Sequence, residues 1–86
     1  MATSVIKTNK LTTTVTSTTG STGNIDISSV VPQNSDVLCA YIPSGTYMCV
    51  PFRQNNNWYL KVIDWSITAY TVVSNTSVTA TVIYTT

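Results

Sequence analysis

The chain alternates between apolar and polar residues in short runs, and turn-forming residues separate these runs. Alternation with a period of two is typical of β-strands that bury one face. The clearest runs are residues 37–42, 47–53 and 58–64. Because only a few turn residues separate each run from the next, we expect them to form a three-stranded meander at the centre of the fold.

Segments before and after this meander show the same period. Residues 3–18 alternate, with a weakly apolar face and a face of threonines over residues 11–18, whereas residues 78–84 alternate between a strongly apolar and a more polar face. The second segment is β-prone and uncharged, so its exposure would favour aggregation. We therefore expect it inside a sheet. Its apolar face consists of Val78, Ala80, Val82 and Tyr84.

Prolines and turn residues predict how the strands are connected. Pro32 removes a hydrogen-bond donor and holds its predecessor extended, so residues 30–35 are predicted to cross between two sheets. Pro51 places its strand at a sheet edge or at a bulge. The last two runs, within residues 65–84, are predicted to form a hairpin.

These features predict an all-β fold, a small antiparallel β-sandwich of about seven or eight strands with no helix longer than a turn. The sandwich domain is expected to cover residues 11–86. The first strand has a thin apolar face and hence a weakly specified register. Residues 1–10 are therefore interpreted as an arm that pairs with a neighbouring subunit, and the alternative is a frayed terminus.

The low charge and short length of the chain indicate which kinds of partner to expect. Charged residues make up 8% of the 86 residues and the net charge is +1, so neither a nucleic-acid surface nor an acidic face is expected. No apolar run reaches membrane-spanning length, and no membrane partner is expected. A chain this short buries only roughly 60–65% of its unfolded surface, and its weak charge offers little repulsion between copies. A homo-oligomer is therefore expected.

The chemistry of the side chains argues against catalysis. The chain lacks His and Glu, so we expect no enzyme activity, no cofactor and no metal. Asp26, Asp36 and Asp64 lie where Asp bonds a turn backbone or ends a strand. Cys39 and Cys49 are expected to be buried free thiols, since a disulfide needs a one-residue slip between their strands.

One segment combines the parts of a carbohydrate site. Side-chain amides that bond hydroxyl groups stand beside aromatic rings that can stack on the apolar face of a sugar, and a guanidinium could pair with an anionic group on a glycan. The alternative interpretation is an exposed turn followed by core aromatics. The candidate ligand-binding residues are Arg53, Asn55, Asn56, Asn57, Trp58 and Tyr59.

The order of these features resembles small β-domains of bacteriophage tail-fibre and other virion structural proteins. A Thr-rich start is followed by GNIDISSVVP, DVLCAYI, NNNWYLKVID and SVTATVIYTT, within residues 23–86. The resemblance implies an antiparallel sandwich that assembles, often as a trimer, in fibres, baseplates or head decorations. It implies a structural protein located in the virion, with other virion proteins as partners. The alternative function is a carbohydrate-binding module that recognises a host surface glycan at a fibre tip.

Overall fold

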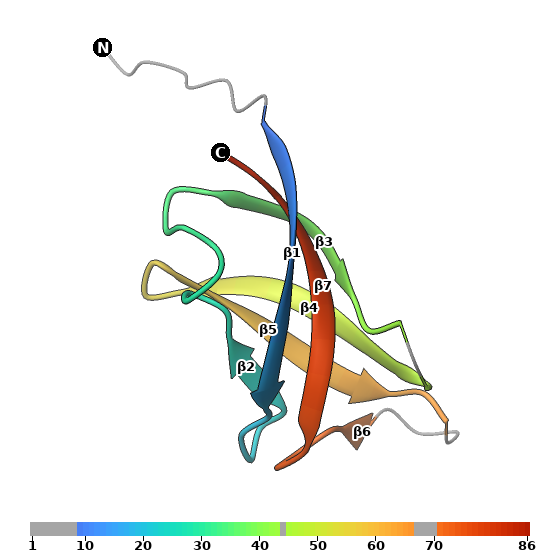
Figure 1. Cartoon of the computed structure of the whole chain (residues 1–86). Helices are drawn as coiled ribbons and strands as arrows, with labels where there is room; N and C mark the ends of the chain where they lie inside the picture. Colours follow the sequence, from blue (N-terminus) through green and yellow to red (C-terminus); the bar gives the residue numbers. More distant parts are fainter. Residues whose placement is uncertain (1–8, 44, 67–70) are drawn as a thin grey trace.

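The computed structural model describes residues 9–43, 45–66 and 71–86. Within these ranges, seven strands form two packed antiparallel sheets of three and four strands (Figure 1). This confirms the predicted antiparallel β-sandwich. In the same ranges no helix is long and apolar enough to span a membrane. The strands are β1 (Lys10–Thr18), β2 (Asn24–Asp26), β3 (Asp36–Tyr41), β4 (Tyr47–Gln54), β5 (Asn57–Asp64), β6 (Thr71–Val72) and β7 (Ser77–Thr85).

The three-stranded sheet has the order β1-β7-β3, with β7 in the centre. Every residue of β1 pairs with β7 in one uninterrupted register, from Lys10 opposite Thr85 to Thr18 opposite Ser77. The alternating apolar residues of β7 are buried, which confirms both the predicted face and the predicted interior position of this strand. Its uncharged, β-branched residues are covered on one face by the second sheet and at both edges by strands.

The four-stranded sheet is organised around β5. β4 pairs with β5 along its whole length, and β2 and β6 pair with the opposite edge of β5. The two short strands meet at Val62, whose N–H donates to Gly23 O at 2.8 Å and whose carbonyl accepts from Val73 N at 3.0 Å. β4 is thus an edge strand, as Pro51 predicted.

The core lies between the two sheets and consists of aliphatic side chains. Ile25 and Ile27 point inward as predicted, with 1% and 0% of their surface exposed. The other fully buried large apolar side chains are Val31, Leu60, Val62 and Val82. The predicted crossing near Pro32 is confirmed, because β2 lies in one sheet and β3 in the other.

The predicted central meander is wrong at its first connection. β3 pairs with β7, so β3 and β4 belong to different sheets and the chain changes sheet between Tyr41 and Tyr47. Of these three strands, β4 and β5 pair as a hairpin and β3 pairs elsewhere. The reason is that alternation identifies a strand and its faces but carries no information on its partner, and the long apolar β7 requires a strand on each side.

Two further predictions change with this topology. Cys39 is exposed and only Cys49 is buried, although both are free thiols. A β-bulge between Val37 and Cys39 inserts Leu38 and turns Cys39 to the outer face, opposite Ile83. The expected last hairpin is also wrong, because β6 pairs with β5 while β7 pairs with β1 and β3. Residues 1–8 of the predicted arm lie outside the described residues.

Candidate functional site

The predicted carbohydrate site is divided between the two faces of one sheet. Adjacent strand residues point to opposite faces. Trp58 faces inward and packs against the core, and its Nε1–H donates to Ser35 O at 2.9 Å. Arg53 is its cross-strand partner, with Cζ 5.8 Å from the Trp58 ring centroid, and Nη2 of Arg53 donates to Gln33 O at 2.9 Å. The hydrogen bonds of these two side chains therefore hold residues 33–35 against the β4–β5 hairpin.

Tyr59 belongs to the outer face of the same sheet. Its ring stacks on Phe52, its partner on β4, with centroids 5.5 Å apart and an interplanar angle of 20°. On the other side of β5 its register partner is Asp26. The next outward-facing row carries Lys61 between Val50 and Asn24. Tyr59 is thus part of an aromatic outer surface bordered by polar groups, and Trp58 is not.

The three asparagines serve the turn that joins β4 to β5. Gln54 pairs with Asn57, so Asn55 and Asn56 form a two-residue hairpin loop. Their φ angles are 53° and 66°, the left-handed values that a type I′ turn requires and that Asn tolerates well. Asn55 and Asn56 are exposed. The predicted turn is confirmed, and its amides lie at the tip of the hairpin.

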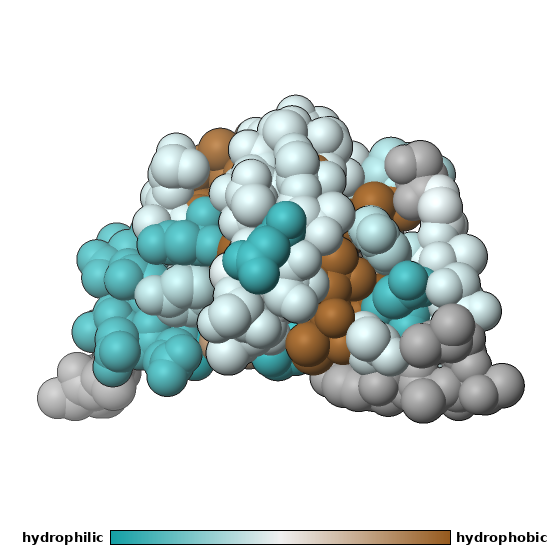
Figure 2. All heavy atoms as spheres, turned by 90° about the horizontal axis from the view of Figure 1, so that it is seen from below, coloured by the Kyte–Doolittle hydropathy of each residue, from teal (hydrophilic) through white to brown (hydrophobic). Residues whose placement is uncertain are grey.

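Exposed apolar side chains concentrate on the edge strands β3 and β4. Leu38 and Tyr41 on β3 are 52% and 50% exposed, and Met48 and Val50 on β4 are 41% and 44% exposed. Figure 2 shows the end of the molecule below the view of Figure 1, where hydrophobic atoms reach the surface among pale residues of intermediate hydropathy. Tyr41 pairs with Thr81 on the outer face of the three-stranded sheet, whereas Met48 and Val50 pair with Ile63 and Lys61 on the outer face of the four-stranded sheet. We call the four side chains together the β3–β4 surface, which covers part of both outer faces.

The outer face of the three-stranded sheet is a regular array of threonines. Thr12, Thr14 and Thr16 on β1 stand opposite Ile83, Thr81 and Thr79 on β7. The hydroxyl oxygens of Thr16 and Thr79 are 2.9 Å apart and share a hydrogen bond. These threonines keep the face polar without charge, and their β-branched side chains suit the strand.

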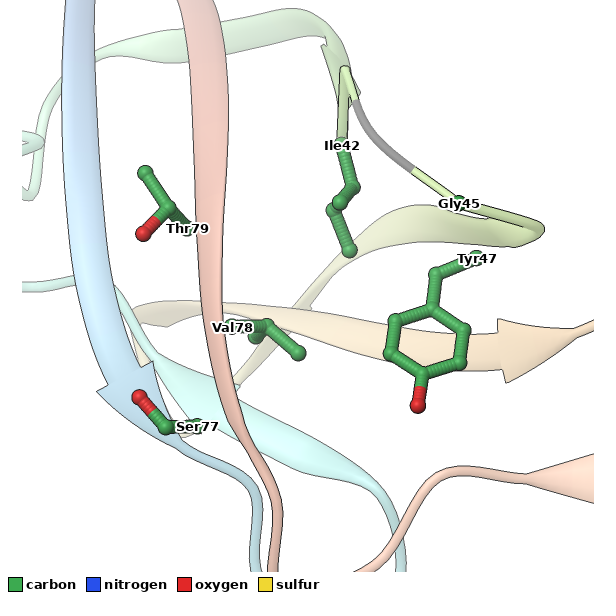
Figure 3. A pocket seen from close by; sticks show the side chains of 6 residues that line it. All are labelled: Ile42, Gly45, Tyr47, Ser77, Val78 and Thr79. Atoms are coloured by element: carbon green, nitrogen blue, oxygen red, sulfur yellow. The ribbon is translucent and has the colours of Figure 1, made fainter.

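A hollow of about 430 Å³ opens beside the first residues of β7 (Figure 3). In Figure 3 the side chains of Ile42, Tyr47 and Val78 point toward the gap between β7 and the connection from β3 to β4. No lining residue is charged, and none belongs to the predicted carbohydrate site. The lining residues of the hollow are Ile42, Gly45, Tyr47, Ser77, Val78 and Thr79.

Two of the aspartates bond turn backbones, as their positions predicted. Asp26 Oδ1 accepts from Ser28 N at 2.8 Å, and Asp64 Oδ1 accepts from Ser66 N at 2.8 Å and from Thr46 Oγ1 at 2.7 Å. Hydrogen bonds from Ser28 lower the pKa of Asp26, and hydrogen bonds from Ser66 and then Thr46 lower the pKa of Asp64. Both carboxylates are therefore held ionised by local turns.

The two thiols are expected to react very differently. Burial, followed by the charge of Cys39, raises the pKa of Cys49 to about 11, so Cys49 stays a protonated, inaccessible thiol at mildly alkaline pH. We predict that a chromogenic disulfide reagent titrates one thiol in the folded chain and the second only in denaturant. Cys39→Ser should remove the fast phase. Two fast thiols in the folded chain would contradict the burial of Cys49.

Comparisons with protein-family models, with curated proteins and with solved structures find no match to this chain.

Proposed function

We propose that this chain is a structural protein of a phage virion, a subunit of a tail fibre, baseplate or head decoration that acts by self-assembly and protein–protein contacts. The observation that carries the proposal is the β3–β4 surface. Four large apolar side chains are about half exposed there, on two edge strands of a protein in which only 8% of residues are charged. Large apolar side chains that stay exposed along two edge strands favour contacts with other chains there.

The composition supports the same function. A surface built from Thr, Ser and Asn keeps a subunit hydrated yet offers little electrostatic resistance to contact between copies. The family resemblance of residues 23–86 supports a location in the virion and other virion proteins as partners. It also favours a trimer, since a fibre axis orders subunits in a closed ring.

A second candidate function is recognition of a host glycan at a fibre tip. The observation that favours it is the stacked pair of Phe52 and Tyr59 on the outer face, with Asp26 in the same row. An aromatic ring bordered by carboxylate and amide groups matches the chemistry of a sugar, which presents an apolar face and a rim of hydroxyls. This assigns the stacking role to Tyr59 in place of Trp58.

Deletion of residues 1–8 tests the assembly and the role of the arm. We stop the deletion at residue 8 because Asn9 O accepts a hydrogen bond from Thr86 N at 3.1 Å and Lys10 pairs with Thr85. We expect the full chain to sediment as an oligomer at micromolar concentrations and the truncated chain to associate more weakly, with a lower melting temperature at equal concentration. The reason is that the arm supplies backbone groups for strand addition.

A full chain that stays monomeric at high micromolar concentration, unchanged by the deletion, would contradict the proposed self-assembly.

The proposed location in the virion has a separate test. Mass spectrometry of purified particles should detect the chain at a copy number that is a multiple of the ring size. Its absence from particles would rule out a virion subunit.

A further inference from the structure

The described part of the sandwich has four strand edges, and three of them resist the addition of another strand. β3 carries the bulge at Leu38, and β4 carries Pro51, which has no N–H to donate. The edge opposite β4 is shared by β2 and β6, which are three and two residues long. Bulges, prolines and short strands are the means by which natural sheets block edge-to-edge pairing.

The remaining edge, that of β1, has none of these features. β1 is nine residues long, contains no proline and pairs with β7 without a bulge. Its only charged residue is Lys10, at its first position. An edge this long and regular is a template for another strand.

The hydrogen-bond pattern shows which residues of β1 face this edge. Thr86 N donates to Asn9 O and Thr19 N donates to Thr76 O, just beyond the two ends of the ladder. Because bonded pairs alternate in an antiparallel ladder, the odd residues of β1 bond β7. The N–H and C=O groups of the even residues point away from β7, and the described residues place no strand on that side. These residues are Lys10, Thr12, Thr14, Thr16 and Thr18.

We propose that this edge pairs with β1 of a second copy, antiparallel, about a two-fold axis at Thr14. The proposal rests on the self-assembly proposed above and names one of its contacts. Thr14 is the middle residue of β1, so each copy's Thr12 stands opposite Thr16 of the partner subunit. All five outward residues then find partners, and five pairs that each exchange two bonds give about ten backbone hydrogen bonds. The two three-stranded sheets become one continuous six-stranded sheet.

Charge favours this direction of pairing. An antiparallel pair places each Lys10 opposite Thr18 of the partner subunit, so the two ammonium groups lie eight residues apart, about 27 Å along the strand. That distance exceeds the screening length of about 8 Å at physiological salt. A parallel pair would set the two Lys10 side chains next to each other, where like charges repel.

The side chains support a second copy as the occupant. Thr14 meets its own symmetry mate on the outer face, as Thr16 meets Thr79 within one chain, where the hydroxyls share a hydrogen bond at 2.9 Å. On the inner face Leu11, 42% exposed in one copy, comes beside Ser17 of the partner subunit. The contact is self-complementary and is compatible with rings formed by the β3–β4 surface. Two trimers would join through three such contacts.

Thr14→Pro tests the pairing. Proline removes the outward N–H of Thr14 and leaves the odd-residue bonds to β7 in place, and Pro51 shows that an edge strand of this fold accepts proline. We expect the dissociation constant of the two-fold contact to rise about a hundred-fold, since the central pair loses both bonds. Thr14→Val is the matched control, because it keeps the N–H and the side-chain shape and should retain association within a few-fold. Sedimentation equilibrium measures both.

Amide hydrogen exchange of the full chain provides a test that does not depend on the folding of the proline variant. We expect the amides of Thr12, Thr14 and Thr16 to be protected in the assembled protein and to lose protection on dilution, whereas those of Thr13 and Val15 stay protected throughout. Fast exchange of the even-residue amides in an assembled chain, or assembly unchanged by Thr14→Pro, would overturn the pairing and leave self-assembly standing. A monomeric full chain would overturn both. Protection that appears only when another virion protein is added would assign the edge to that protein and likewise overturn the two-copy pairing.

Discussion

Replacing Gly23 with alanine is expected to lower the free energy of unfolding by about 2–5 kcal/mol, a large part of the stability of so small a domain. Gly23 has a φ of +82°, which L-residues adopt only with strain. A Cβ at this position would lie 3.0 Å from Val72 Cβ, 3.2 Å from Val62 O and 3.3 Å from Val73 O. Two of these neighbours are backbone oxygens, and one of them, Val62 O, accepts the 3.0 Å hydrogen bond from Val73 N that joins the end of β6 to β5, so it cannot move without breaking that bond.

The other glycines of the chain separate the two contributions to this cost. Gly45 has a φ of +78° and open space where a Cβ would lie, so Gly45→Ala should show the conformational cost alone, about 1 kcal/mol. Gly20 has its nearest contact, Asn24 O, at 3.9 Å, so Gly20→Ala should be close to neutral. Chemical denaturation of the three variants gives the comparison. Equal stability of the Gly23 and Gly20 variants would contradict the close packing around Gly23.

The local features of this fold could be predicted from sequence because they depend on residues close together in the chain. Alternation in residues 78–84 identified both the strand and its buried face, and Pro51 indicated an edge strand or a bulge, of which the structure has the edge strand. The pairing of β3 with β7 could not be predicted, since their partnership joins residues about 40 or more positions apart, from Asp36 opposite Thr85 to Tyr41 opposite Thr81. Propensity along the chain does not encode such a choice.

The bulge at Leu38 shows a second limit. No glycine or proline marks it in the sequence, yet it changes which side chains face outward and so exposes Cys39. Gly23 shows a third limit. The residues around it predicted a turn, but the close approach of Val72 and Val73 involves residues about 50 positions further along the chain.

The candidate carbohydrate site also combines features that the sequence could predict with one that it could not. The hairpin turn at Asn55 and Asn56 could be predicted from composition alone. The separation of Trp58 from Tyr59 could also have been predicted, since consecutive residues of a strand face opposite sides. What no sequence pattern indicated is the hydrogen bond from Trp58 to Ser35, which ties the crossing segment to β5.

Trp58→Ala is expected to destabilise the sandwich by about 3–5 kcal/mol. The substitution removes a large side chain that packs on the core and leaves Ser35 O, in a residue only 1% exposed, without its 2.9 Å donor. Trp58→Phe keeps most of the ring volume and loses the donor, so it should cost less, about 1–3 kcal/mol. Chemical denaturation of the two variants measures the packing and hydrogen-bond contributions separately.

The same residues decide between the two candidate functions when the variants are applied to a glycan array. Tyr59→Ala removes a ring on the outer face, outside the core. It should therefore change the free energy of unfolding by no more than about 1 kcal/mol. If the chain binds a glycan through its outer face, Tyr59→Ala should abolish that binding while Trp58→Phe, assayed where it is folded, retains it. Glycan binding that disappears in Trp58→Phe at an unchanged denaturation midpoint would instead place Trp58 in a ligand site and contradict its role as the inner anchor of β5. If the original chain binds no glycan on the array while its assembly is intact, the glycan-recognition function is contradicted and the proposed structural function is retained.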